Sequence, residues 1–511
     1  MLIKNKIIRD TVLLTLMQIA LDSAGLLLNV FITGKLGSSA MGILSLTGSF
    51  LVLAGTLSNG NAFLCTSRLV SEELGRKNNN PQRVLFYAVA LCSLLSCIVS
   101  VLIIFLAPVI SSKFFSTSAM CKAVRMMPFA LLPGAFSACL KGYFNAFRRS
   151  EITASGDILE FIVKALTLII LTLVKNPDSE SEICTVMITG IIAGNVFSLV
   201  FFTLMLLKHG KHYHGKASIG FSSYVKFALP IMAGSVLTSA LSSANDALIP
   251  VTLRQFGNSV EEALSKFGIF EAIVIPTLFF PSVALCSMSG IIVSETAHAR
   301  SAGDNGKLRH LTEKLVGGTL IYAVFASAVL IKFGAETGML LGGGALAGKM
   351  ISVIAPVIPF IYLEIILEAL IKGMGLQSFS SLNYLAEYAV RISCVLVFVP
   401  VFGFYGIVIS YYSSNIIGNL SRLIKIIRHT KAHLSLIKAV IPPVILAFMT
   451  LKATELPFRF FSADTTSLPV MIAFVLIWTA LYFAFFAFKA SSLRLSGISL
   501  SKFKNSFVEN A

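Results

Sequence analysis

Long apolar segments alternate with short polar ones from one end of the 511-residue chain to the other. A helix needs about 20 apolar residues to cross a hydrocarbon layer about 30 Å thick. Lipid cannot satisfy backbone polar groups and the chain lacks strand-like alternation, so the pattern predicts an all-α polytopic membrane protein with about 14 transmembrane helices. The predicted spans are 11–33, 41–66, 84–107, 124–143, 154–174, 183–207, 224–252, 267–293, 311–332, 350–371, 382–400, 403–424, 436–453 and 468–488.

Composition excludes a water-soluble fold. Hydrophobic residues make up 56% of the chain and charged residues 13%, and the mean hydropathy is +0.85. Such a chain cannot supply the polar surface that a soluble protein of this length needs. The net charge of +17 is spread over many short loops without interleaved aromatic residues, so nucleic acid is not an expected partner.

The basic residues predict the orientation of the chain. If the N-terminus is cytoplasmic, the inner segments hold 28 of the 41 Lys and Arg residues, including those of 141–150 and 422–438. This bias indicates an even number of spans with both termini inside. The first apolar run is long, contains Asp22 and has no cleavage site, so we interpret it as a retained helix rather than a signal peptide.

Two stretches of the chain read as copies of one element. Each begins with Lys-Gly, at 141–142 and at 372–373, and continues into an apolar run that holds an acid and a base four residues apart. These pairs are Glu160/Lys164 and Glu387/Arg391, and each lies on one helix face. The segments 67–76 and 294–303 also match.

Six spans separate the copies, which predicts a parallel repeat of two six-helix lobes. We expect an N-lobe (1–213, helices 1–6), a C-lobe (214–433, helices 7–12), two extra helices (434–490) and a short cytoplasmic tail (491–511).

Polar and ionisable side chains inside the spans are the candidates for function, because each needs a partner or a wet cavity in the membrane. They come from equivalent helices of both lobes, as expected if they face a central cavity. An alternative is that the charges only neutralise each other so that the helices can insert. Glu271 is expected near the outer interface. The other candidates are Asp22, Asn29, Asn59, Asn61, Glu160, Lys164, Asn245, Asp246, Glu364, Glu368, Lys372, Glu387 and Arg391.

Prolines in the spans predict kinks, because proline removes a backbone hydrogen bond. Kinks in matching helices suit lobes that rock between inward-open and outward-open forms. The expected hinge residues are Pro128, Pro133, Pro276, Pro281, Pro356 and Pro359.

Other motifs do not support a nucleotide or metal site. The segment 343–349 resembles a P-loop, but Met350 stands where Ser or Thr would bind magnesium, and no βαβ unit surrounds it. The eight cysteines have no metal-site spacing. His209, His212 and His214 share a basic inner loop that we expect to be solvated. We expect no catalytic residue, no metal and no cofactor, although H⁺ or Na⁺ could be a coupling ion.

Several stretches resemble a known family. They are Phe267–Pro281 with the following Ser294-Glu295, Asp246–Arg254, and Gly142–Asn145 leading to Glu160 and Lys164. Together they resemble bacterial polysaccharide exporters of the stage V sporulation protein B family. That family belongs to the multidrug/oligosaccharidyl-lipid/polysaccharide (MOP) superfamily, with the MurJ lipid II flippases and the MATE transporters.

The resemblance implies two lobes around a cationic cavity. It also implies alternating-access export of an undecaprenyl-linked cell-wall or polysaccharide precursor across the bacterial cytoplasmic membrane, by a monomer without enzymatic activity. Relatives carry cavity-facing arginines on helix 1, whereas here that helix offers Asp22 and Asn29. Capture of the diphosphate would then rest on Lys164, Arg391, Lys372 and Arg254.

Two other functions remain open. A cation-coupled multidrug exporter of the MATE type would have a carboxylate-lined lobe, for which Asp22, Glu364 and Glu368 qualify. A membrane-embedded glycan polymerase or ligase would present catalytic residues on a large outer loop, and the chain offers none of that size.

Overall fold

The computed structural model describes residues 2–75, 80–115, 120–209, 218–460 and 467–495. The described residues form helices and short connections without a strand, which confirms the predicted all-α fold class. The α-helices are α1 (Leu2–Asn59), α2 (Ala62–Leu74), α3 (Pro81–Lys113), α4 (Cys121–Val124), α5 (Pro128–Ala146), α6 (Ser150–Lys175), α7 (Glu180–His209), α8 (Phe221–Gln255), α9 (Val260–Ile269), α10 (Ile275–Phe279), α11 (Val283–Ser301), α12 (Asn305–Lys332), α13 (Gly334–Leu340), α14 (Gly344–Ile354), α15 (Ile358–Gly373), α16 (Gln377–Phe402), α17 (Phe404–Thr430), α18 (Leu436–Phe460) and α19 (Leu468–Leu495). A π-helical turn, η2 (Phe270–Val274), and two 3₁₀ turns, η3 (Phe280–Ser282) and η4 (Ala355–Val357), interrupt the longer helical rods.

Each predicted span has a helical counterpart. In the described part of the chain, 11 helical segments are long and apolar enough to cross a membrane. The first of these, Thr15–Leu74, covers two predicted spans, because the chain bends at Gly37 (φ 85°) without losing its helical assignment. Helices α6 and α17 lie outside that set, are richer in polar side chains and occupy the predicted spans 154–174 and 403–424.

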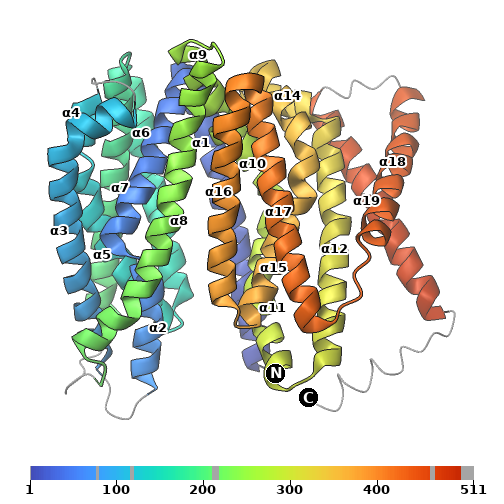
Figure 1. Cartoon of the computed structure of the whole chain (residues 1–511), viewed down its shortest axis with the longest axis horizontal. Coiled ribbons are helices and arrows are strands. Elements are labelled where there is room, and N and C mark those ends of the chain that lie inside the picture. The colour runs from blue at the N-terminus through green and yellow to red at the C-terminus, as the bar shows by residue number, and fades with distance from the viewer. Residues whose placement is uncertain (1, 76–79, 116–119, 210–217, 461–466, 496–511) are drawn as a thin grey trace.

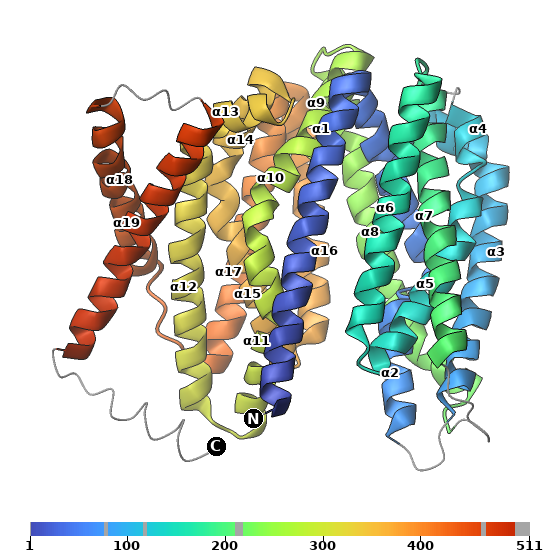
Figure 2. The same cartoon turned by 180° about the vertical axis from the view of Figure 1, so that it is seen from behind.

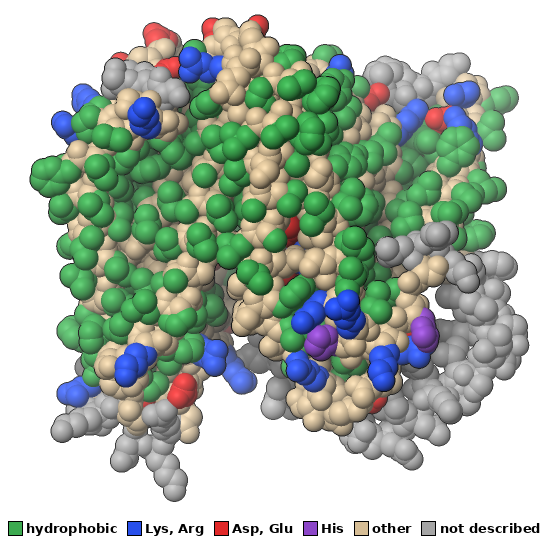
Figure 3. Space-filling view, viewed as in Figure 1, with side chains coloured by type: hydrophobic (Ala, Val, Ile, Leu, Met, Phe, Trp, Pro, Cys, Tyr) green, Lys and Arg blue, Asp and Glu red, His purple; other side chains and the backbone are tan. Residues whose placement is uncertain are grey.

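The helices form two bundles side by side, with α18 and α19 packed on α12 at one end (Figures 1 and 2). Helices α2–α7 make up one bundle and α10–α17 the other, while α1 and α8 run between them. On the face seen in Figure 3, apolar side chains form a broad belt and charged side chains gather toward the two ends of the molecule. The start of α1 and the end of α19 lie at the same end, which we call the inner end.

At the opposite, outer end the two bundles meet tightly through α1 and α9. A Cβ added to Gly42 would lie 2.1 Å from the carbonyl oxygen of Leu264, and one added to Gly268 would lie 2.4 Å from the amide nitrogen of Gly42. The hydroxyls of Ser38 and Ser265 are 2.5 Å apart. Only glycine permits this backbone contact, so these residues close the outer end of the seam.

Prolines mark several of the helix interruptions. Pro281 lies in η3 and Pro356 in η4, while Pro276 is the second residue of α10, which follows the π-helical turn. Helix α8 also contains Pro230 and Pro250, which were not among the expected hinge residues. The predicted tail 491–511 falls mostly outside the described residues, as do His212 and His214.

Candidate functional site: a charged cavity in the second bundle

A cavity of about 490 Å³ lies within the second bundle. Side chains from α8, α11, α15, α16 and α17 line it, together with residues of η2 and α10. The structure thus brings together residues that are far apart in the sequence. The candidates that line this cavity are Asn245, Asp246, Glu271, Glu364, Glu368, Lys372, Glu387 and Arg391.

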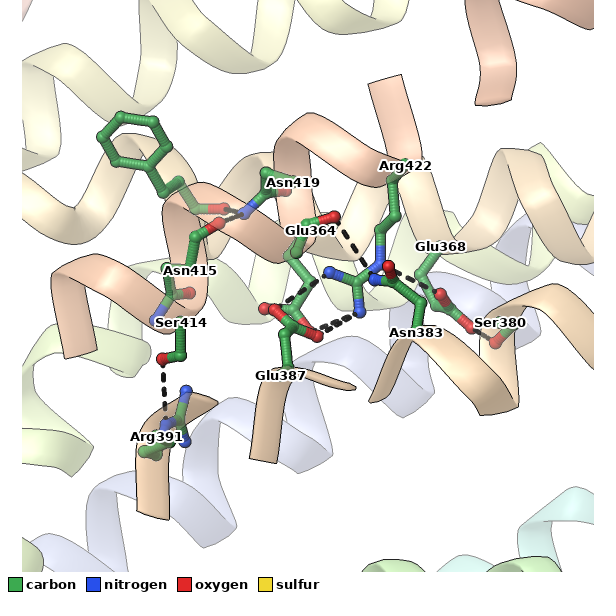
Figure 4. Close-up of polar contacts among 12 residues, drawn as sticks. Glu364, Glu368, Ser380, Asn383, Glu387, Arg391, Ser414, Asn415, Asn419 and Arg422 are labelled. Carbon is green, nitrogen blue, oxygen red and sulfur yellow. Dashed lines mark hydrogen bonds and ion pairs between the residues drawn. The ribbon is translucent and has the colours of Figure 1, made fainter. Parts of the chain in front are cut away.

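The centre of this charge cluster is Arg422 on α17, whose side chain is fully buried (Figure 4). Its guanidinium lies 2.8 Å from Glu387, 3.2 Å from Glu364 and 3.4 Å from Glu368. It also lies 4.8 Å from the centre of the Tyr384 ring. One arginine therefore joins carboxylates from α15 and α16 through charge-assisted hydrogen bonds.

Sequence reasoning missed Arg422 because it counted this residue among the basic charges of the inner segment 422–438. A usable signal was present. Polar side chains recur along α17 at helical spacing and stay buried, which marks one polar face leading to Arg422. The members of that face are Ser410, Ser414, Asn415, Asn419 and Arg422.

The predicted Glu387/Arg391 pair is not an ion pair. Glu387 bonds to Arg422, and Arg391 instead donates from Nε to the hydroxyl of Ser414 at 3.1 Å. The Arg391 guanidinium also lies 4.4 Å from the centre of the Tyr411 ring and 5.4 Å from that of Tyr388. The idea that the two charges only neutralise each other on one helix is therefore wrong for this pair.

The inner mouth of the cavity holds a second ion pair. Lys372, which is 42% exposed, lies 3.3 Å from Glu368, and Glu368 also accepts a hydrogen bond from Ser380. Glu271 had been expected near the outer interface, but it lines the cavity from the π-helical turn η2. The bulge in the helix ladder there places a carboxylate among groups of α8 and α16.

The balance of charge differs from the expected cationic cavity. Five carboxylates line this cavity, whereas its bases are Lys372 and Arg391, with Arg422 directly behind them. Acidic side chains therefore outnumber basic ones at the centre of the second bundle. Arg422 is engaged by three of these carboxylates and is not left for an anionic ligand.

A second hollow, of about 970 Å³, lies between α1, α6 and the segment α10–α11. Asp22, Asn29 and Lys164 line it. Among the residues that the structure describes, none forms an ion pair with Lys164, whose Nζ lies 5.7 Å from the centre of the Phe161 ring.

The predicted Glu160/Lys164 pair is likewise not an ion pair. Glu160 lies 3.1 Å from Lys141 on α5, which also contacts Asp157. The sequence analysis placed Lys141 in an inner segment. In the structure it lies on α5, and its side chain contacts α6 within the first bundle. Lys164 is left as a cation facing the hollow between the two bundles.

A line of hydrogen bonds joins α1 and the break between α1 and α2 to α8. Ser49 donates to Asp246 at 2.7 Å, the hydroxyls of Thr56 and Ser239 are 3.1 Å apart, and Asn61 donates to Ser235 at 3.1 Å. Beside Asp246 a smaller cavity of about 460 Å³ opens along this seam. Asp246 thus connects the charged cavity of the second bundle to α1.

The remaining candidates lie elsewhere. Arg254 is exposed near the end of α8 and lines none of the three cavities described above. Asn59 accepts a hydrogen bond from the backbone of Asn61 at the break between α1 and α2. Asn29, besides lining the hollow, donates to the carbonyl of Ala272 at 2.9 Å.

Comparisons with known proteins agree with this architecture. The family model MatE matches residues 14–174. Stage V sporulation protein B of Bacillus subtilis (strain 168) is 20% identical over 405 residues, which cover 77% of this chain and 78% of that protein.

Solved transporter structures share the fold. The lipid II flippase MurJ in an inward closed conformation superposes with a TM-score of 0.70 at 14% identity, over 94% of this chain and 99% of its own. An inward-facing multidrug resistance MATE family transporter of the MOP superfamily has a TM-score of 0.58 at 16% identity, over 81% of this chain and 96% of its own.

These matches and the observed helix arrangement confirm the resemblance drawn from the sequence. They also agree with the membrane-spanning helices and with the polar cavities between and within the bundles. The chain shares the helix arrangement of these MurJ and MATE transporter structures, and its described residues include 11 helical segments that are long and apolar enough to cross a membrane.

Proposed function

We propose that this protein is a membrane transporter that moves a polyprenyl-diphosphate-linked sugar precursor outward across the bacterial cytoplasmic membrane by alternating access. The two lobes would be 1–213 and 214–433, and both termini would be cytoplasmic. We expect the protein to act as a monomer and without enzymatic chemistry.

The observation that carries the proposal is the environment of Lys164. It is a cation without an ion-pair partner among the described residues, and it faces a hollow between the bundles that α10 and α11 close on the far side. A diphosphate is an anion that an ammonium group binds well, and a partly desolvated site strengthens the attraction. The hydroxyl and amide groups of Thr15, Gln18 and Asn29 line the same hollow and suit a sugar.

The appended helices give separate support. The MATE transporter covers 81% of this chain, whereas MurJ covers 94% and is itself covered to 99%. The chain therefore shares with a lipid II flippase more of its length than it shares with the MATE structure. We take the extra length to be α18 and α19, which the predicted repeat leaves without a counterpart.

The acid excess in the second bundle favours a second candidate, a cation-coupled multidrug exporter. Asp246, Glu271 and the carboxylates around Arg422 suit a cationic drug or a coupling H⁺ or Na⁺ better than an anionic lipid. In this alternative the ligand would occupy the second bundle, and Lys164 would have no direct part in transport.

Complementation separates the two functions. The chain is expressed in cells depleted of their own lipid II flippase, and in a pump-deficient strain exposed to cationic dyes. We expect growth of the depleted cells and unchanged dye sensitivity, with growth lost in the K164A/R391A variant. Dye resistance without complementation would replace the proposal with the multidrug function. Wild-type growth of the double variant would contradict the role of these two bases.

The depletion strain tests lipid II itself. For other lipid-linked sugars, the purified protein in vesicles is given a fluorescent polyprenyl-diphosphate sugar, and arrival at the opposite leaflet is followed by quenching. Failure in both assays would contradict the lipid-linked cargo.

A further inference from the structure

Glu73, near the inner end of α2, is a buried carboxylate outside the cavities described above. Its side chain is fully buried, and its two oxygens accept three backbone hydrogen bonds. The donors are the amides of Asn80 (3.0 Å), Ser218 (2.8 Å) and Ile219 (3.2 Å). Among the described residues no Lys or Arg lies within ion-pair distance of it. A buried carboxylate is costly unless it is hydrogen-bonded, so these three amides are what allow it to remain there.

The three amides belong to two separate segments of the chain. Asn80 caps α3 by accepting a hydrogen bond from the amide of Arg83 at 3.1 Å. Ser218 and Ile219 lie just before α8, the first helix of the predicted C-lobe (214–433). Glu73 therefore fastens the inner end of α8 to the first bundle.

The inner half of α8 packs as part of the first bundle. Ile219, Tyr224 and Ala228 are buried in one apolar core with residues of α2, α3 and α5. The hydroxyl of Tyr224 lies 3.3 Å from that of Thr66 on α2, and the ring of Phe221 lies 5.7 Å from that of Tyr87 on α3.

The outer half of α8 belongs to a different core. Ile249 and Leu253 are buried in a core that spans both bundles, with residues of α9, α14 and α15 and also of α1, α3 and α7. This half of the helix packs against α16 of the second bundle as well. Between the two halves, Pro230 lies inside the helix, and a Cβ added to Gly234 would meet no atom within 4 Å. Proline removes a helix hydrogen bond and glycine bends easily, so this stretch is a point where the helix can bend, as is Pro250 nearer its outer end.

We propose that Glu73 is a positioning residue for transport: it holds the inner end of α8 on the first bundle, so that α8 bends between Pro230 and Gly234 when the bundles rock. The boundary between the two bundles that move relative to each other then lies inside α8 and not in the segment before it. The inference rests on the proposed alternating-access function, but the contact itself can be tested without any cargo.

Hydrogen exchange of the full-length protein tests the contact. The variants are Glu73→Ala, Glu73→Gln and the shorter carboxylate Glu73→Asp, with Glu72→Gln at the exposed neighbouring position as the matched control. We expect the amides of Ser218 and Ile219 to exchange about tenfold faster or more in the Ala and Gln variants, because bonds to a charged acceptor are lost. The Asp variant should recover part of the protection, and the control should match the wild type. Unchanged protection in both the Ala and the Gln variant would overturn the proposal.

Distance measurements test the mechanical role. Spin labels on the exposed residues Ser71 and Ser222 report the separation of α2 from the inner end of α8. We expect one narrow distance distribution in the wild type and a broader, longer one in Glu73→Gln. A narrow distribution in that variant would contradict the tether.

Export by the same variants is then measured. A wild-type protein that exports while Glu73→Gln exports at least about tenfold less, at equal folded amount, supports the positioning role. Full export by Glu73→Gln overturns it. If the Glu73 variants show the exchange and distance effects but the wild-type protein exports no lipid-linked sugar, the proposed cargo is contradicted and the contact is still established.

Discussion

Glu387 on α16 bonds to Arg422 on α17 at 2.8 Å and not to Arg391, although Arg391 is one helical turn away on the same helix. The two helices pack closely because Gly418 faces Glu387. A Cβ at Gly418 would lie 2.0 Å from the Glu387 carboxylate. The absent side chain gives the carboxylate room to reach Arg422, and Arg391 is left to the aromatic rings of Tyr388 and Tyr411.

Replacement of Arg422 by leucine should strongly destabilise the second bundle. Three carboxylates would lose their common partner, and breaking a buried ion pair from one side costs about 3–5 kcal/mol. We expect a lower thermal midpoint in detergent and less folded protein. The matched control is Arg428→Leu, an exposed arginine on the same helix. If R422L/E387Q is no more stable than R422L alone, the loss of stability in R422L does not come from the unpaired Glu387 carboxylate.

Gly268→Ala should hold the outer end of the seam open. The new methyl group would lie within 2.4–2.5 Å of the backbone of Gly42 and Ser38, and overpacking of this kind costs about 1–3 kcal/mol. We expect a cysteine at position 38 to react several-fold faster with a membrane-impermeant thiol reagent added from outside. Gly290→Ala is the control, because a Cβ there meets no atom within 4 Å. Equal labelling in the two variants would show that this contact does not close the seam.

Lys164→Gln should lower export of a lipid-linked sugar at least about tenfold, since a charge-assisted hydrogen bond to a phosphate contributes about 1.5–3 kcal/mol. Lys164→Arg keeps the charge and should retain part of the activity. Lys175→Gln, at the exposed end of the same helix, serves as the control for removal of a lysine. Export is measured in vesicles at matched protein amount. Full activity of the Gln variant would rule out a direct role for Lys164.

Arg391→Lys should reduce transport although it preserves the charge. The planar guanidinium of Arg391 stacks on Tyr411 while it bonds to Ser414, and the tetrahedral ammonium group of a lysine cannot do both. A cation–π contact contributes about 0.5–2 kcal/mol. We expect an intermediate loss for Arg391→Lys and a larger one for Arg391→Gln, in the same vesicle assay. A lysine variant as active as the wild type would mean that only the charge at this position matters.

The sequence predicted the fold well because its strongest signals are local. Apolar length fixed the helices, and even the break at 59–61 is visible as Asn-Gly-Asn, where the chain adopts left-handed backbone at Gly60 and Asn61. It also selected the charged residues that line the cavity of the second bundle, since an ionisable group within an apolar run is costly without a partner or a wet cavity.

The ion-pair partners of these charged residues could not be predicted from the sequence. Glu160 forms an ion pair with Lys141 and Glu387 with Arg422, whereas Lys164 has no ion-pair partner among the described residues. The three-carboxylate arrangement around Arg422 and the hydrogen bonds of Glu73 to the start of α8 join segments far apart in the chain. The sequence alone determined the helices, the membrane environment and the set of charged candidates, because these depend on near neighbours along the chain. Only the tertiary structure decided the partners and the sign of the cavity, because a side chain pairs with the charge that packing brings within a few ångströms, not with the one nearest in sequence.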